Sequence, residues 1–213
     1  MMATTHGLLG LALGAVIALL APEHATTAMA AGLLGGVAPD LDLYRGHRRT
    51  LHFPVYGSIL TAVVVAIAIL VATPVTVALA AFVAAAALHA ATDVLGGGLE
   101  LRPWEGNSER AVYSHYHGRW LSPRRWVPYD GSLHDLGLAA GLAVPAVLWT
   151  DGLLQLIIAG AVVVSLGYTL LRKRLAAIAA TLVTLLPAAV HPHVPERYRS
   201  TANSHSNTVS RYQ

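Results

Sequence analysis

The sequence predicts an all-α fold, a polytopic transmembrane helical bundle of about five to seven apolar helices with two polar cytoplasmic loops. Composition is the first reason: the 213 residues are 55% hydrophobic and 12% charged, and this charged fraction is about half that of soluble domains. The second reason is that the charges are clustered, which leaves long uncharged runs between them. A straight bilayer crossing needs about 20 such residues.

Seven apolar segments follow one another at residues 7–21, 25–38, 55–72, 74–95, 133–149, 152–171 and 175–190. The third, fourth and sixth are long enough to span a bilayer. The first two are short and rich in Ala and Gly, so we expect a helical hairpin packed inside the bundle, where Gly32 and Gly36 have the spacing that allows close approach. Pro74 suits the first turn of the fourth helix.

We expect residues 1–195 to form one integral-membrane domain with polar loops at about 39–54 and 96–132. Residues 196–213 form a tail whose Ser/Asn/Thr-rich end predicts disorder. Eleven of the fourteen basic residues fall in the two loops or at 172–174. The positive-inside rule places these three regions on the cytoplasmic side of the cell (inner or plasma) membrane. Seven spans would put Arg197, Arg199 and Arg211 on the other side, whereas the tail moves to the cytoplasmic side if one short segment does not cross.

The chain has no cysteine, so any metal must be held by nitrogen and oxygen, which suits Zn²⁺, Mn²⁺, Mg²⁺ or iron. Histidine and aspartate are concentrated on the same predicted face. Seven of the eleven histidines fall on or beside it, namely His6, His47, His52, His89, His115, His117 and His134. Imidazoles and carboxylates on one patch are what a metal site requires.

The first polar loop carries two pairs of candidate ligands. Asp40 and Asp42 point the same way on an extended backbone. Because two carboxylates that point the same way repel each other, we expect a cation between them. The alternative is a pair that only balances the charge of the loop arginines. His47 and His52 would be about 140° apart on a helix. They therefore converge only in a loop or at a helix start. The alternative for this pair is a lining for an anionic membrane surface.

The strongest signal within an apolar segment is His89 with Asp93. Four residues apart on a helix, they share one face, and burying them in lipid without a function would be costly. Asp93 can bind a metal or orient an imidazole; a simple intrahelical hydrogen bond is the alternative.

The second loop gives weaker signals. His115 and His117 chelate together only on an extended backbone, and Asp135, after His134, is equally suited to a helix N-terminus. Aromatic residues in this loop indicate a belt at the membrane interface. A surface that binds lipid head groups is the alternative. They are Trp104, Tyr113, Tyr116, Trp120, Trp126 and Tyr129.

Several short motifs in the first half of the chain carry a resemblance. They are Thr5-His6, Pro39-Asp40-Leu41-Asp42, His47-Arg48, Thr50-Leu51-His52 and Leu88-His89 with Asp93. In this order they resemble the YdjM-like family of inner-membrane, membrane-bound metal-dependent hydrolases. The likeness covers roughly residues 1–95 and the loop that follows. It implies a membrane-embedded hydrolase whose metal is held by these histidines and aspartates. A weaker similarity, in the His/Asp layout, is to zinc-dependent phospholipase C.

The predicted function is hydrolysis at the cytoplasmic face, with a divalent ion activating water toward phosphoester or lipid-headgroup substrates. Zn²⁺ is favoured over Mn²⁺ or Mg²⁺. The expected metal ligands are His6, Asp40, Asp42, His52, His89 and Asp93. His47, Arg48 and His117 are expected to act in catalysis, and Arg48 and Arg49 to bind an anionic small-molecule or lipid substrate.

The expected partners are membrane lipid and this substrate, and no nucleic acid. The main alternative is a non-catalytic membrane protein, either a metal-binding transporter or an interaction scaffold. A transporter needs polar groups near the bilayer midplane. Segments 55–72, 152–171 and 175–190 contain no charged or amide residue except Gln155 near an end, which counts against it.

Overall fold

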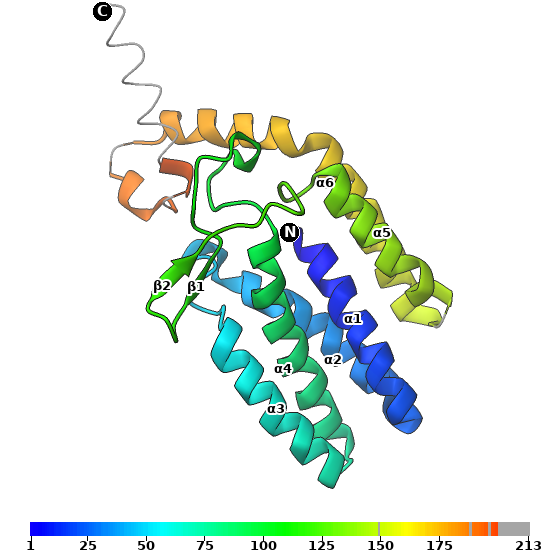
Figure 1. Ribbon diagram of the computed structural model, residues 1–213. Coiled ribbons are helices and arrows are strands. Elements are labelled where there is room, and N and C mark those ends of the chain that lie inside the picture. Colours follow the sequence, from blue (N-terminus) through cyan, green and yellow to red (C-terminus); the bar gives the residue numbers. More distant parts are fainter. Residues whose placement is uncertain (149, 188, 196, 200–213) are drawn as a thin grey trace, which may run out of the picture.

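The computed structural model describes residues 1–148, 150–187, 189–195 and 197–199. Its longest elements are α1 (Ala3–Leu20), α2 (Ala25–Val37), α3 (Pro54–Leu70), α4 (Pro74–Thr92), α5 (Leu133–Leu148) and α6 (Gly152–Leu185). The short 3₁₀ helices are η1 (Pro22–His24), η2 (Ala38–Tyr44), η3 (Asp93–Leu95), η4 (Pro103–Glu105) and η5 (His191–His193). The helices form an up-and-down bundle, and the N-terminus lies at the end that carries the polar loops (Figure 1).

Three helices of the described chain, α1, α4 with its extension to Leu95, and α6, are long and apolar enough to cross a membrane. This confirms the helical, membrane-type fold. Helices α3 and α5 are apolar but have only 17 and 16 residues, so the expected five to seven spans stay a prediction. Ile59, Val63 and Ile67 of α3 are exposed at about every fourth position, which suits a face in contact with lipid.

The predicted hairpin of the first two helices is confirmed, and glycines let the helices touch. A Cβ on Gly10 of α1 would collide with the carbonyl oxygen of Gly32 in α2, and a Cβ on Gly36 would collide with the carbonyl oxygen of His6. Backbones this close require glycine. The Gly32/Gly36 spacing therefore sets the distance between α1 and α2. It also brings His6 against the end of α2.

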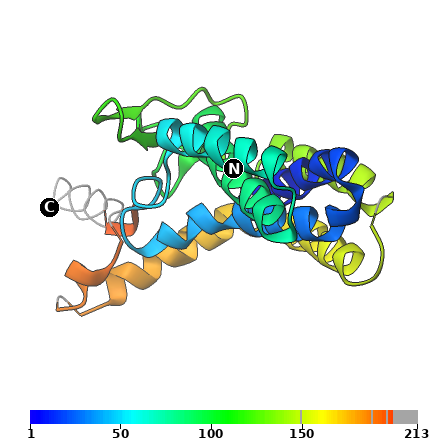
Figure 2. The ribbon, with the colours of Figure 1, turned by 90° about the horizontal axis from the view of Figure 1, so that it is seen from below.

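Helix α6 corrects the predicted boundary between the sixth and seventh segments. It continues for 34 residues through Arg172, Lys173 and Arg174, because arginine and lysine are good helix formers. Its second part, orange in Figures 1 and 2, turns away and extends beyond the bundle. The Oγ of Ser165 donates to the carbonyl of Ala161, a contact that often accompanies helix bending.

The chain after α6 stays at the polar end. Arg197 lines a cavity together with Asp40 and His47, so the prediction that Arg197 lies on the opposite side from the candidate ligands is wrong. The physical reason is that α6 bends instead of ending and recrossing. Of the tail predicted to be disordered, residues 197–199 form a helical turn, and residues 196 and 200–213 lie outside the described residues.

Two further features of the polar end position α1. Asp135, at the start of α5, is fully buried and accepts hydrogen bonds from the Met2 amide and the Thr5 hydroxyl, both at 2.7 Å. This clamp fixes the first turn of α1 and hence His6. The second loop also contains a small antiparallel hairpin, β1 (Val112–Ser114) with β2 (Arg119–Leu121), which the all-α prediction did not include.

Candidate metal centre

Four predicted ligands meet at the polar end of the bundle. Asp40 comes from η2, His52 from the loop before α3, His89 from the last turn of α4, and Asp93 from the residue that follows α4. One ligand atom from each lies within 4.8 Å of those of the other three. His52, His89 and Asp93 are at most 1% exposed, whereas the side chain of Asp40 is 21% exposed.

The spacing of these atoms suits a metal ion. The Nε2 atoms of His52 and His89 are 3.2 Å apart, and Asp93 Oδ2 lies 3.4 and 3.5 Å from them. Asp40 Oδ1 lies 3.5 Å from His89 Nε2. A tetrahedron with metal–ligand bonds of about 2.1 Å has edges of about 3.4 Å. A metal ion can therefore lie at bonding distance from the Nε2 atoms of His52 and His89 and from Asp93 Oδ2, with Asp40 Oδ1 beside them.

Hydrogen bonds to the outer nitrogens turn both imidazoles toward this point. His89 Nδ1 lies 2.6 Å from the carbonyl oxygen of Gly36, and His52 Nδ1 lies 3.0 Å from Asp42 Oδ2. A carbonyl and a carboxylate only accept hydrogen bonds, so each Nδ1 donates. In the neutral rings both Nε2 lone pairs then face each other across 3.2 Å, beside two carboxylates. A metal cation beside these four groups would satisfy them all, and a proton carried by one imidazole would satisfy the contact between the two nitrogens.

Asp42 lies behind His52 and outside this group of four. The backbone from Ala38 to Tyr44 is a 3₁₀ helix, and not the extended chain on which residues two apart share a side. Asp42 therefore points away from Asp40 and contacts Nδ1 of both His47 and His52 at 3.0 Å. This is the position of a carboxylate that orients a metal-bound histidine.

The hydrogen bonds around Asp42 also shift pKa values. Burial raises the pKa of the Asp42 carboxyl, but hydrogen bonds from His47 and His52 outweigh this and hold it well below its usual range. Burial lowers the pKa of His52, but its bonds to Asp42 and Asp93 raise it overall. For Asp40, burial is again outweighed, here by the hydrogen bond with His89, so its pKa is lowered. The carboxylates are therefore ionised near neutral pH.

Two positive groups also contact Asp93. Arg48 Nε lies 3.2 Å from Asp93 Oδ2, and the Met1 ammonium lies 3.0 Å from Oδ1. Arg48 is buried, donates to the Gly97 carbonyl, and has a left-handed backbone with φ of 59°. This conformation is uncommon outside glycine and is often found at functional sites.

His6 lies beside the group of four. It is 1% exposed, its ring packs on His89 with centroids 3.7 Å apart, and its Nε2 is 3.5 Å from Asp93 Oδ1. Neither ring nitrogen has a hydrogen-bond partner among the described residues. His6, which the sequence predicts as a metal ligand, therefore lies outside the group of four and faces the other oxygen of Asp93.

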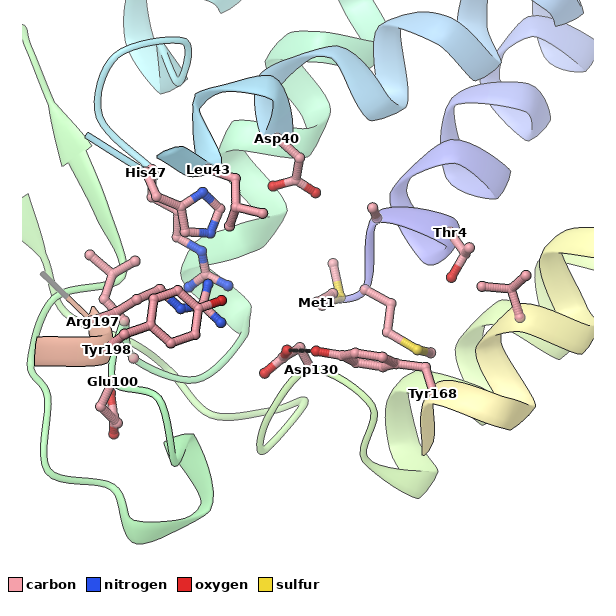
Figure 3. Close-up of a pocket in the computed structure, with 16 residues that line it drawn as sticks. Met1, Thr4, Asp40, Leu43, His47, Glu100, Asp130, Tyr168, Arg197 and Tyr198 are labelled. Atoms are coloured by element: carbon pink, nitrogen blue, oxygen red, sulfur yellow. Dashed lines mark hydrogen bonds between the residues drawn. The ribbon is translucent and has the colours of Figure 1, made fainter. Parts of the chain in front are cut away.

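A cavity of about 380 Å³ is lined by one of the four ligands, Asp40. Asp40 and His47 lie on one side of it, and Asp130 and Tyr168 on the opposite side (Figure 3). Arg48 lines it as well. Burial lowers the pKa of His47 more than its hydrogen bond to Asp42 raises it. A neutral imidazole therefore faces the cavity that contains Asp40.

Two predicted residues are held elsewhere. His117 lies in the turn between β1 and β2, where Nδ1 contacts the Ser114 hydroxyl at 2.8 Å. His117 is exposed and lines neither of the two cavities described here, so its catalytic role stays a prediction. Arg49 is exposed, with its guanidinium 4.6 Å from the Tyr113 ring centroid, and it lines a second cavity of about 390 Å³ that also includes His47.

The sequence analysis missed an ion-pair network beside the cavity. Arg172 donates to both oxygens of Asp130 at 3.0 and 3.1 Å and to the Leu101 carbonyl. Tyr168 donates to the same carboxylate. Burial raises the pKa of Asp130, but the Arg172 charge outweighs it and the pKa is lowered. The hydrogen bonds from Arg172 and Tyr168 hold the second loop against α6.

Comparison of the chain with family models, curated proteins and solved structures gives no match. The resemblance to YdjM-like hydrolases therefore rests on the motifs quoted above.

Proposed function

We propose that the protein is a membrane-embedded, metal-dependent hydrolase of anionic esters, of the YdjM-like type that its motifs resemble. The observation that carries the proposal is the pair of Nε2 atoms of His52 and His89. They face each other at 3.2 Å while both Nδ1 atoms donate elsewhere. Two carboxylates complete a nitrogen-and-oxygen ligand set, which favours Zn²⁺ and is compatible with Mn²⁺.

An open coordination position distinguishes a catalytic metal site from a structural one. Of the four ligands, Asp40 is the one that lines the cavity. The largest ligand separation, up to 4.8 Å, exceeds the edge of about 3.4 Å of a closed tetrahedron. Because Asp40 lines the cavity, a water molecule on the metal would be reached from that side, and a bound Zn²⁺ would lower its pKa to about 7.

The cavity residues suit a phosphoester. The guanidinium of Arg48 binds phosphoryl oxygens and stabilises the charge that develops on them. When hydroxide attacks phosphorus, a new P–O bond forms and the bond to the leaving oxygen breaks. His47, supported by Asp42, takes the water proton and returns it to the leaving oxygen. Substrate, leaving group and proton carrier then share one cavity.

The position of the centre favours this proposal over a transporter. The ligands lie at the ends of α2 and α4 and in the adjoining loops, whereas a transported ion binds near the bilayer midplane between broken helices. A membrane-surface site also gives access to substrates in water or in the lipid head-group layer.

The test is metal content and turnover of protein purified in a mild detergent. Wild type is expected to retain a divalent metal and to hydrolyse a generic phosphodiester such as bis(p-nitrophenyl) phosphate. His52→Ala should lose both, and His134→Ala, which replaces an exposed histidine, should lose neither. Metal binding by His52→Ala at the wild-type level would overturn the site. Metal binding without turnover of any ester would support a transporter or scaffold.

A further inference from the structure

We propose that His6 and the second oxygen of Asp93 hold a second divalent cation, so that the centre is dinuclear. This inference rests on the metal site proposed above and extends it. The added observation is His6, a buried histidine outside the four ligands whose Nε2 lies 3.5 Å from Asp93 Oδ1.

Asp93 divides its two oxygens between two groups of histidines. Oδ2 lies 3.4 and 3.5 Å from Nε2 of His52 and His89. Oδ1 faces His6 instead. A carboxylate whose oxygens face separate nitrogen donors has the arrangement of a bridge between two metal ions.

The spacing of the rings agrees with such a bridge. The imidazoles of His6 and His89 pack with centroids 3.7 Å apart and planes at 37°, and each ring has Nε2 at 3.5 Å from a different oxygen of Asp93. The two ions would then be bridged by the two oxygens of one carboxylate. Two-metal hydrolases hold their ions about 3.5–4 Å apart.

Burial gives the second reason to place an ion at His6. Its side chain is 1% exposed, and both ring nitrogens lack hydrogen-bond partners among the described residues. A buried polar atom without a hydrogen-bond partner destabilises the folded state. Its position is nevertheless fixed, because the neighbouring Thr5 donates to Asp135 and Gly36 packs against the His6 backbone. A metal bond to Nε2 removes the cost at one of the two atoms.

The surrounding charges predict that the second ion binds more weakly than the first. It has two protein ligands, compared with four for the first ion. The Met1 ammonium contacts Oδ1 at 3.0 Å and Arg48 contacts Oδ2 at 3.2 Å, so two cations already face Asp93. His6 Nδ1 also lacks the acceptor that usually anchors a ligating histidine. The remaining coordination positions are left to water and substrate.

A dinuclear centre narrows the substrate class to phosphate esters. Two ions about 4 Å apart can stabilise both the attacking and the leaving oxygen of an in-line displacement at phosphorus. One P–O bond forms, the opposite P–O bond breaks, and the two electrons of the broken bond leave with the departing oxygen.

The experiment is a Mn²⁺ titration of the full chain in detergent, with bound equivalents counted and electron paramagnetic resonance recorded. Wild type is expected to bind two Mn²⁺ per chain with a spin-coupled signal. His6→Gln should bind one Mn²⁺ and give an uncoupled signal, while the exposed His134→Gln behaves as wild type.

The outcomes separate this inference from the proposed function. One uncoupled Mn²⁺ in wild type overturns the second site and leaves the first, and no bound Mn²⁺ or Zn²⁺ overturns both. Two ions retained in His6→Gln overturn the role of His6. The coupled signal of wild type requires no variant, so the proposal remains testable if His6→Gln fails to fold.

Discussion

The carbonyl oxygen of Gly36 accepts a 2.6 Å hydrogen bond from His89 Nδ1, while the α-carbon of the same glycine packs against the backbone of His6. Gly36, at the end of α2, thus orients the imidazole of His89 and allows the backbone of His6 to approach. The lack of a side chain at position 36 is a requirement of the metal centre as well as of helix packing.

Gly36→Ala is therefore expected to weaken metal binding at least tenfold and to lower the melting temperature. The new Cβ would collide with the backbone of His6, and separating α1 from α2 would move His6 and the acceptor of His89. Metal titration and thermal unfolding in detergent measure both effects. Gly141→Ala in α5 is the control, because its Cβ meets open space and alanine favours a helix by about 1 kcal/mol. Equal metal affinity in the two variants would contradict the role of Gly36.

Asp42→Asn is expected to lower metal affinity about 10–100-fold without removing a metal ligand. The change weakens the hydrogen bonds from Nδ1 of His47 and His52, so the ring of His52 loses its orientation. A competition titration with a chelating dye measures the affinity. Asp151→Asn, at an exposed position, should not change it. Complete loss of metal would instead indicate that Asp42 is itself a ligand.

Arg48→Gly should tighten metal binding and raise the KM for an anionic phosphoester about 10–100-fold, because hydrogen bonds from charged groups contribute about 1.5–3 kcal/mol. The guanidinium now competes with a metal for Asp93 Oδ2 and is proposed to bind the substrate. Glycine suits the left-handed backbone at this position, so the fold is spared. Arg119→Ala, in β2, is the control for loss of charge. A lowered metal affinity in Arg48→Gly would contradict this assignment.

The ion pair between Asp130 and Arg172 should make stability depend on pH in the acid range. The folded-state pKa of Asp130 lies below its usual value, so its contribution is present above about pH 4 and is lost as the pH falls through the folded pKa. Breaking a largely buried pair costs about 3–5 kcal/mol. Wild type should therefore melt well above Asp130→Asn at pH 7, and the difference should shrink as the pH falls below about 4. A difference in melting temperature that stays constant with pH would exclude this ion pair as the cause.

Single cysteines placed in this cysteine-free chain test the topology. Thr50→Cys, Asn107→Cys and Arg199→Cys should react with an impermeant reagent from the same side of the membrane, because the chain after α6 stays at the polar end. Glu23→Cys, in the turn between α1 and α2, should react from the other side. Labelling of Arg199→Cys with Glu23→Cys would restore the seven-span arrangement.

Local spacing was enough to predict the parts of the centre that depend on regular structure. His89 and Asp93 are one helical turn apart, and the structure confirms their contact at 3.5 Å. Alternation of apolar segments across a membrane also brought Asp40 and His52 to the same end as this pair. These inferences required only the period of a helix and the direction of each segment.

The sequence was less informative where an irregular backbone or a distant contact decides the outcome. Asp42 diverges from Asp40 because η2 is a 3₁₀ helix, and nothing in Pro39-Asp40-Leu41-Asp42 separates that from extended chain. Arg172 looked like part of a loop because hydropathy falls there. Its partner Asp130 lies 42 residues away, and no local pattern indicates such a pairing.

The ligands of the centre are also confined to one part of the chain. Every residue assigned to either ion lies between His6 and Asp93, and all are carried by α1 to α4 or their connections. During synthesis the complete ligand set thus leaves the ribosome before α5 and α6 exist. Because Asp135 of α5 holds the first turn of α1, the position of His6 is fixed only after α5 has packed against the first four helices.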